Sequence, residues 1–143
     1  MISIHCHPDH EYPFHSGNEE ETGRGAGEGT TLNLPLLPKT TWNESYKPAL
    51  EQAVTRIHEF GATALVVSMG LDTLEGDPCA VVRAGFKLSG NDYLEMGKTI
   101  GYNKIPTLFI QEGGYKMDKI AQAAADVLAG FAESQQHVQG NDL

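Results

Sequence analysis

Four short apolar segments predict β-strands. They are residues 2–6, 31–36, 64–68 and 106–111. The second alternates apolar and polar positions until Pro35, which has no backbone N–H, so this strand must end or lie at an edge there. The third is apolar at nearly every position, as in a parallel strand that is buried on both faces.

Longer segments, in which apolar residues recur three and four positions apart, predict helices. The first has apolar residues from Tyr46 to Phe60 and closes at Gly61, a residue that readily adopts the left-handed conformation of a helix end. Asn43 or Ser45 is its predicted cap, because both side chains accept hydrogen bonds from free backbone N–H groups.

Two further helices are predicted towards the end of the chain. A short one is capped by Asn91 or Asp92, and its apolar positions are Tyr93, Met96 and Ile100. A longer one follows a cap at Asp118, and its apolar face consists of Ile120, Ala124, Val127, Leu128 and Phe131. From Glu133 the sequence is polar without periodicity, so we expect it to fray.

The order of these elements predicts a parallel α/β sheet. The first predicted helix joins two strands, which makes a right-handed crossover if those strands are parallel. The 143 residues predict one domain, residues 1–132, followed by a polar tail, residues 133–143.

Residues 7–30 predict a long loop. They contain five glycines, two prolines, three histidines and the run Glu19-Glu-Glu21, with no sustained periodicity. Loops of this length within a compact domain are functional or disordered. The glutamate run is typical of a solvated face, and the glycines of 23–29 lack the Lys-Ser/Thr pair and the strand-to-helix setting of a phosphate loop.

The strongest chemical signal is Asp72, which directly follows the predicted strand 64–68. The carboxyl end of a buried parallel strand is where open α/β sheets place their ligands, and a carboxylate there suits a metal. The predicted strand 106–111 likewise leads into Glu112-Gly-Gly-Tyr115, a turn that lets backbone approach a ligand and places a phenol beside it.

Several motifs occur together in a characteristic order along the chain. They are Ser3-Ile-His5, Tyr12-Pro-Phe14, the Gly-rich segment 23–29 with Leu32-Asn-Leu-Pro-Leu36, Gly70-Leu-Asp72 with Gly76-Asp-Pro78, and Glu112-Gly-Gly-Tyr115. In this combination the chain, up to about Phe131, resembles the histone deacetylase superfamily, and within it the bacterial acetylpolyamine amidohydrolases. The resemblance implies a truncated α/β fold, a parallel-sheet three-layer sandwich of the arginase/deacetylase type.

The resemblance also implies roles for individual residues. Asp72 matches the last zinc ligand of the family, whose zinc polarises an acetamide carbonyl and activates water. Tyr115 matches the catalytic tyrosine that donates to the developing oxyanion. The substrate-channel positions are Phe14, Gly113 and Gly114. A structural monovalent cation is implied near Ser3 and the backbone of residue 4.

Other parts of the family's machinery have no counterpart in this sequence. The paired catalytic histidines and the Asp-x-His segment that supplies two more zinc ligands belong to the family's earlier half. The chain is therefore expected to be the C-terminal portion of a zinc-dependent amidohydrolase that deacetylates N-acetylated amines, of the acetylpolyamine or acetyl-lysine type. The alternative is a stand-alone truncated family member without catalysis, which acts as a folded binding or oligomerising module.

Residues near these motifs leave smaller alternatives open. Two of the histidines 5, 7, 10 and 15 could join Asp72 as substitute metal ligands, although plain loop histidines are the commoner case. Asp77 either hydrogen-bonds backbone near the ligand loop or is a turn residue before Pro78. Cys6 and Cys79 show no spacing that pairs them with an activating histidine.

The composition of the chain limits the classes of binding partner. Nineteen acidic residues against ten basic ones give a formal charge of -9, which argues against nucleic acid and is compatible with a cationic acetylated amine. Two cysteines, no apolar run of membrane-span length and no signal-peptide pattern favour the cytoplasm and argue against a membrane partner. Loss of the family's earlier strands would expose a sheet edge, so we expect a homo-oligomer or a complementing partner.

Overall fold

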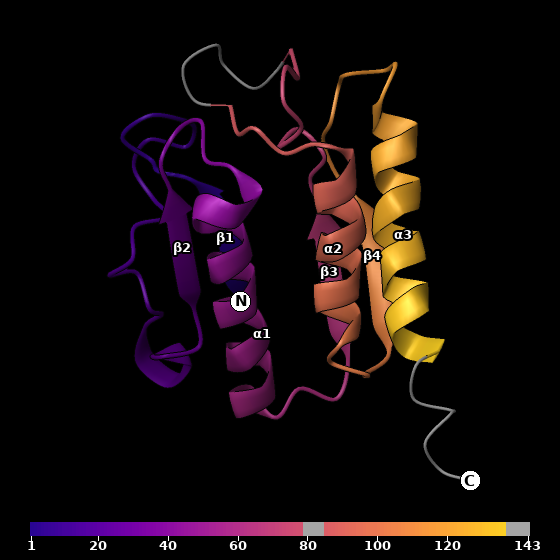
Figure 1. Cartoon of the computed structure of the whole chain (residues 1–143). Helices are drawn as coiled ribbons and strands as arrows, with labels where there is room; N and C mark the ends of the chain where they lie inside the picture. The colour runs from indigo at the N-terminus through magenta and orange to yellow at the C-terminus, as the bar shows by residue number, and fades with distance from the viewer. Residues whose placement is uncertain (79–84, 137–143) are drawn as a thin grey trace, which may run out of the picture.

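The computed structural model describes residues 1–78 and 85–136 (Figure 1). A short 3₁₀ turn, Gly25–Gly27, interrupts the first loop, and a π-helical turn, Trp42–Tyr46, precedes the first helix. The other elements in chain order are β1 (Ile2–Cys6), β2 (Leu32–Leu36), α1 (Lys47–Phe60), β3 (Leu65–Met69), α2 (Gly90–Gly101), β4 (Thr107–Gln111) and α3 (Ile120–Gln136). All four predicted strands are present, with bounds within one residue of those expected.

The strands form two parallel pairs in the described part of the chain. β1 pairs with β2, with Ile2 opposite Leu32, and β3 pairs with β4, with Leu65 opposite Thr107. α1 returns the chain from the end of β2 to the start of β3, so the two strands point the same way but lie in different sheets (Figure 1). The expected parallel α/β arrangement is therefore present, but the described strands form two separate pairs, with no pairing between β1 and β3.

Two of the helix caps differ from the prediction. Neither Asn43 nor Ser45 caps α1, because both lie within the π-helical turn, and Thr41 precedes this turn without a side-chain cap bond. The predicted end of α1 is confirmed, since Gly61 has a φ of 70° and its N–H reaches carbonyls of the last turn.

α2 begins earlier than its apolar pattern suggested. Ser89 is the N-cap, and Asp92 is the third helical residue, whose carboxylate accepts from the Ser89 N–H at 2.8 Å. Asp92 thus contributes to the start of the helix as one half of a capping box.

α2 and α3 pack closely on each other through glycines. A Cβ added at Gly97 would lie 2.0 Å from the carbonyl oxygen of Val127, and one at Gly130 would lie 2.0 Å from that of Leu94. The predicted apolar face of α3 is correct at Ile120 and Val127, which are buried, and wrong at Leu128, which is 48% exposed.

The end of α3 also differs from the prediction. The helix continues to Gln136, into the segment expected to fray, because tertiary contacts hold it. Glu133 lies 3.4 Å from Lys98 Nζ, and the Gln135 side chain donates to the carbonyl of Gly101 at 2.6 Å. Residues 137–143 of the predicted tail lie outside the described residues.

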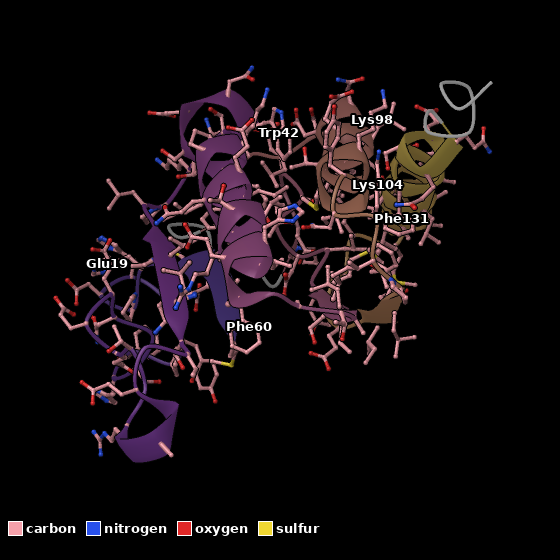
Figure 2. All side chains as sticks on the ribbon, turned by 90° about the horizontal axis from the view of Figure 1, so that it is seen from below. Glu19, Trp42, Phe60, Lys98, Lys104 and Phe131 are labelled. Atoms are coloured by element: carbon pink, nitrogen blue, oxygen red, sulfur yellow. The ribbon has the colours of Figure 1, made fainter. Side chains whose placement is uncertain are left out.

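The acidic part of the first loop is solvent-exposed, as predicted for residues 19–21. Figure 2 shows Glu19 on the side of the molecule opposite to Lys98 and Phe131. Among the residues with described positions, no helix is long and apolar enough to cross a membrane.

Candidate metal-ligand and tyrosine loops

The two loops singled out from the sequence lie side by side. β3 and β4 are parallel neighbours, with Met69 opposite Gln111, so the segments that follow them leave the sheet at the same end. Backbone hydrogen bonds extend the pairing past the strands, from the Glu112 N–H to Met69 O at 3.1 Å and from the Leu71 N–H to Gly113 O at 3.5 Å. Asp72 and the Gly113-Gly-Tyr115 turn are thereby brought together.

Two glycines enclose the Asp72 carboxylate. A Cβ at Gly113 would lie 2.7 Å from one carboxylate oxygen, and a Cβ at Gly70 would lie 3.2 Å from the other. Gly113 also has a φ of 75°, a conformation that other residues rarely adopt. Glycine is therefore required at residue 113 for both space and backbone conformation.

Gly114 serves a different purpose. Its φ is 102°, and an added Cβ would lie 2.6 Å from Ile120 Cδ1 and 2.8 Å from Leu71 Cβ. Both neighbours belong to the core, so Gly114 allows the turn to pack tightly against it.

The Asp72 carboxyl lies in an environment that disfavours its charge. Partial burial raises the pKa of Asp72, and the carboxylates of Asp77 and, more weakly, Glu11 raise it further. The contribution of Glu11 also indicates that the loop after β1 approaches this end of β3. A bound cation would relieve this unfavourable environment, because a positive charge stabilises the carboxylate.

Asp77 fixes the position of the tyrosine turn. Its side chain is 3% exposed, and its Oδ2 accepts hydrogen bonds from the backbone N–H of Tyr115 at 2.6 Å and of Lys116 at 3.0 Å. The first of the two sequence interpretations of Asp77 is thus confirmed. Tyr115 itself is 49% exposed.

The Asp72 loop is also held in place by buried residues next to Asp72. Leu71 and Leu74 are buried on either side of it, and the Thr73 hydroxyl is 2.9 Å from the hydroxyl of the fully buried Tyr93. Burial, followed by the nearby Asp72 charge, raises the pKa of Tyr46 to about 12, so this phenol stays neutral at physiological pH.

The remaining predicted site residues lie on β1 and its loop. Phe14 has a φ of 62° and is 54% exposed. The Ser3 hydroxyl is 2.8 Å from His5 Nδ1, and His5 Nε2 is 2.9 Å from the carbonyl oxygen of Gly17. Because a carbonyl only accepts, Nε2 carries the proton and Nδ1 of the neutral ring accepts from Ser3. His5 therefore ties the loop to β1, a role that the sequence did not reveal.

A complete zinc site requires three or four protein ligands, and Asp72 is one. Within residues 1–78 and 85–136, no group of three His, Cys, Asp or Glu side chains is arranged to hold a metal. His7 and His10 contact each other edge to face, with centroids 6.0 Å apart, but the substitute site with Asp72 is not formed. The described residues thus fit one ligand position and do not complete the site.

Cys6 does not have the environment of a reactive thiol. Burial raises its pKa, and so does the charge of Glu11, which lowers the fraction of thiolate. Cys79 lies outside the described residues.

Comparison with known proteins identifies the family. The histone deacetylase domain model matches residues 1–131. An acetylpolyamine amidohydrolase of Mycoplana ramosa is 44% identical over 135 residues, and acetylpolyamine amidohydrolase 2 of Pseudomonas aeruginosa is 41% identical over 131 residues. The crystal structure of an acetylpolyamine aminohydrolase from Burkholderia pseudomallei superposes with a TM-score of 0.85 at 28% identity and covers 93% of this chain.

The chain belongs to the histone deacetylase family. The similar proteins include amidohydrolases that carry acetylpolyamine in their names, and the fold is the truncated α/β fold expected. The match spans 92% of this chain but 37% of the Mycoplana ramosa protein, and 37% of the Burkholderia pseudomallei structure.

Proposed function

We propose that this chain forms part of a zinc-dependent amidohydrolase that hydrolyses N-acetylated amines to the free amine and acetate. The observation that carries the proposal is the pairing of the Asp72 carboxylate with the Tyr115 turn at one end of β3 and β4. The names of the relatives, which match most of this chain, support the acetylpolyamine class of substrate.

In this proposal the residues of the chain have separate tasks. Asp72 is one metal ligand, and the other ligands come from polypeptide that this sequence does not include. The Tyr115 hydroxyl donates to the oxygen on which negative charge develops, a task that requires a donor fixed before the reaction. Asp77 provides this fixation through the backbone of Tyr115 and Lys116.

The substrate would be bound by its apolar stem and its charge. Phe14 supplies an exposed aromatic surface for the stem of an acylated amine, and Gly113 leaves room for the Asp72 carboxylate. The formal charge of -9 favours the approach of a polyamine, which is cationic. A monovalent cation near Ser3 and a cytoplasmic location, both predicted from the sequence, belong to the same proposal.

A non-catalytic function is the second candidate. It is favoured by the incomplete ligand set among the described residues, since a lone carboxylate does not hold zinc tightly. In that case the chain is a folded module that binds a partner or forms a homo-oligomer. A monomer in light scattering at micromolar concentration would contradict the homo-oligomer.

Metal analysis of the purified chain and of an Asp72→Ala variant distinguishes the candidates. If Asp72 is one ligand of a shared zinc site, elemental analysis after mild dialysis finds about one zinc per parent chain when the rest of a family protein is supplied in trans, and clearly less with the variant. Hydrolysis of acetylated polyamines then tests the enzyme directly. The amidohydrolase proposal fails if zinc and hydrolysis remain absent even when the rest of a family protein is supplied in trans.

A further inference from the structure

Polar side chains lie on the face of the β1–β2 pair that turns away from the core. Side chains alternate along a strand, and Ile4 and Cys6 pack against the core, so Ser3 and His5 point to the opposite face. Asn33 of β2 is the partner of Ser3 in the parallel register and shares this face. Ser3, His5 and Asn33 thus form a polar cluster on the outer face of the pair.

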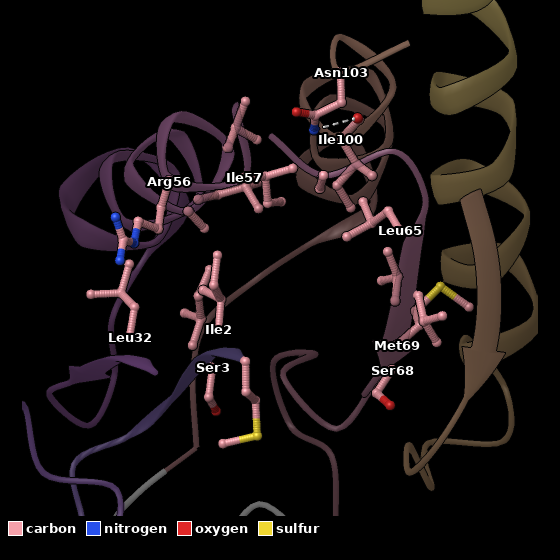
Figure 3. Close-up of a pocket in the computed structure, with 18 of the residues that line it drawn as sticks. Ile2, Ser3, Leu32, Arg56, Ile57, Leu65, Ser68, Met69, Ile100 and Asn103 are labelled. Atoms are coloured by element: carbon pink, nitrogen blue, oxygen red, sulfur yellow. Dashed lines mark hydrogen bonds between the residues drawn. The ribbon is translucent and has the colours of Figure 1, made fainter. Parts of the chain in front are cut away.

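Both ring nitrogens of His5 have partners. The Ser3 hydroxyl is 2.8 Å from Nδ1, and Nε2 is 2.9 Å from the carbonyl oxygen of Gly17. Ser3 borders the cavity of about 560 Å³ between β1 and β3 (Figure 3), but its hydroxyl is bonded to His5. Because the Ser3 proton goes to Nδ1, the ring is held in the tautomer that donates from Nε2 to Gly17.

Gly17 fits closely against the His5 ring. Its φ is 96°, a conformation that other residues rarely adopt, and an added Cβ would lie 2.6 Å from His5 Nε2. Glycine is therefore required at residue 17 by the backbone conformation and by the ring. The imidazole lies directly against the backbone of the loop.

A second side chain of the cluster binds the next residue of the loop. Asn33 is 5% exposed, and its Nδ2 donates to the carbonyl oxygen of Asn18 at 3.0 Å. A buried amide that lost this partner would be destabilising, so the bond holds the loop as well as the side chain. Gly17 and Asn18 are therefore fastened to β1 and β2 by His5 and Asn33.

The beginning of the same loop is also fixed. The His7 N–H donates to the carbonyl oxygen of Leu36 on β2 at 2.8 Å, and Pro8 is fully buried. Residues 7–17, the Phe14 loop, are thus held to the strand pair at both ends. The position of the residues between these ends depends on both attachments.

The Phe14 loop lies towards the Asp72 end of the molecule. β1 is parallel to β2, and α1 carries the chain from the end of β2 back to the start of β3, so the segments after β1 and β3 leave at the same end (Figure 1). Glu11 is close enough to Asp72 for its charge to raise the pKa of that carboxyl. The Phe14 N–H donates to the carbonyl oxygen of Glu11 at 3.2 Å, so both residues belong to one turn.

We propose that His5 is a positioning residue for substrate binding, because its bond to Gly17 holds the end of the Phe14 loop against β1 and thereby fixes Phe14 beside the stem of an acylated amine. This inference rests on the proposed function, in which Phe14 is an apolar wall for that stem. A wall that is ordered before binding increases affinity, since ordering it during binding costs conformational entropy. Loss of the bond to Gly17 weakens substrate binding and leaves the chemical step unchanged.

Two amide substitutions separate the two bonds of His5. In His5→Gln the amide nitrogen can take the place of Nε2 and donate to the Gly17 carbonyl. In His5→Asn the side chain is one methylene shorter, so the amide lies near the place of Nδ1 and does not reach Gly17. Both variants are polar and uncharged and differ mainly in reach. His58→Asn makes the same change at an exposed histidine in the last turn of α1 and is the control.

Amide-resolved hydrogen exchange in the chain alone tests the attachment of the loop. In His5→Asn, the N–H groups of Phe14 and His15 should exchange about fivefold faster or more, which is the effect of one lost hydrogen bond on local opening. In His5→Gln and His58→Asn these rates should stay within about twofold of those of the parent. The N–H groups of α2 should exchange equally in all four proteins.

Hydrolysis of an acetylated polyamine, with the rest of a family protein supplied in trans, tests the consequence for substrate binding. His5→Asn should raise KM about fivefold and retain kcat, whereas His5→Gln should keep both within about twofold. A merely destabilised protein would instead show a lower kcat, because less of it is folded. In a Phe14→Ala background, His5→Asn should have no further effect on KM, because His5 acts through Phe14.

Several results would overturn the His5 proposal. These are unchanged exchange of the Phe14 amide in His5→Asn, an unchanged KM in an active His5→Asn complex, or a full effect of His5→Asn in the Phe14→Ala background. If His5→Asn does not fold, the imidazole nitrogen resonances of the parent chain decide, since a proton on Nδ1 in place of Nε2 would refute the bond to Gly17. A parent complex without hydrolysis would refute the amidohydrolase proposal, and hydrogen exchange would still decide whether His5 holds the loop.

Discussion

The Gly97→Ala variant should destabilise the protein, although a Gly→Ala change within a helix usually has the opposite effect. In an unobstructed helix interior, alanine is more favourable than glycine by about 0.5–1 kcal/mol. At Gly97 the new Cβ would lie 2.0 Å from the carbonyl oxygen of Val127 and 2.8 Å from the backbone N of Phe131. Both are backbone atoms of α3, so no side-chain rotation relieves the overlap.

The expected change in unfolding free energy is the difference between the cost of this overlap and the gain in helix propensity. Ordinary contact requires 3.4–4 Å, so α2 and α3 must separate by more than 1 Å at this point. Overpacking of this kind is destabilising by about 1–3 kcal/mol, and a rigid backbone neighbour places it in the upper part of the range. After the gain in helix propensity, the free energy of unfolding should fall by about 1–2 kcal/mol.

Urea unfolding followed by far-ultraviolet circular dichroism measures the change. The control is Gly90→Ala in the first turn of the same helix, where the nearest atom to an added Cβ is an Asp126 oxygen at 3.9 Å. This variant should be as stable as the parent or more stable, by up to about 1 kcal/mol. A Gly97→Ala protein that equals or exceeds the parent in stability would refute the packing argument.

Three further changes test the site and its surroundings. Asp77→Ala removes the acceptor of two partly buried hydrogen bonds from backbone N–H groups, at 2.6 and 3.0 Å, and should lower the free energy of unfolding by about 3 kcal/mol. An unchanged urea midpoint would contradict this. Gly113→Ala and Gly61→Ala both place alanine at a φ near 70°, which lowers the free energy of unfolding by about 1–2 kcal/mol. Only the new Cβ at residue 113 also meets the Asp72 carboxylate, so Gly113→Ala should be the more destabilising of the two. Equal losses of unfolding free energy would show that the contact with Asp72 is unimportant. Burial raises the pKa of Tyr46 to about 12, whereas the phenol in the unfolded chain ionises near 10. By pH 11 the parent should therefore lose about 1.4 kcal/mol of unfolding free energy that the Tyr46→Phe variant retains. Parallel pH profiles of unfolding free energy for the two proteins would rule this out.

The sequence predicted the elements whose determinants are local. Strand bounds were correct within one residue, and Gly61 ended α1 as expected, because apolar periodicity and a left-handed glycine act over a few positions. The neighbourhood of Asp72 and Gly113 was also predictable, since both follow strands that pair in parallel.

Features that depend on tertiary contacts were not predictable. The last turn of α3 persists because Glu133 and Gln135 contact α2, although its own sequence is polar. The His5 bond to Gly17 joins residues that are far apart along the chain and has no local signal. The separation of the described strands into two pairs, β1 with β2 and β3 with β4, likewise had no local signal.

The division of the sheet has a consequence for cooperativity. One half of the chain consists of β1, β2 and α1, and the other consists of β3, β4, α2 and α3, in which two helices pack closely over a strand pair. One hydrophobic core packs residues of both halves, so the halves differ in how readily their own elements open and not in having separate cores. The first half, with one helix, will open more readily, and its amides will exchange first.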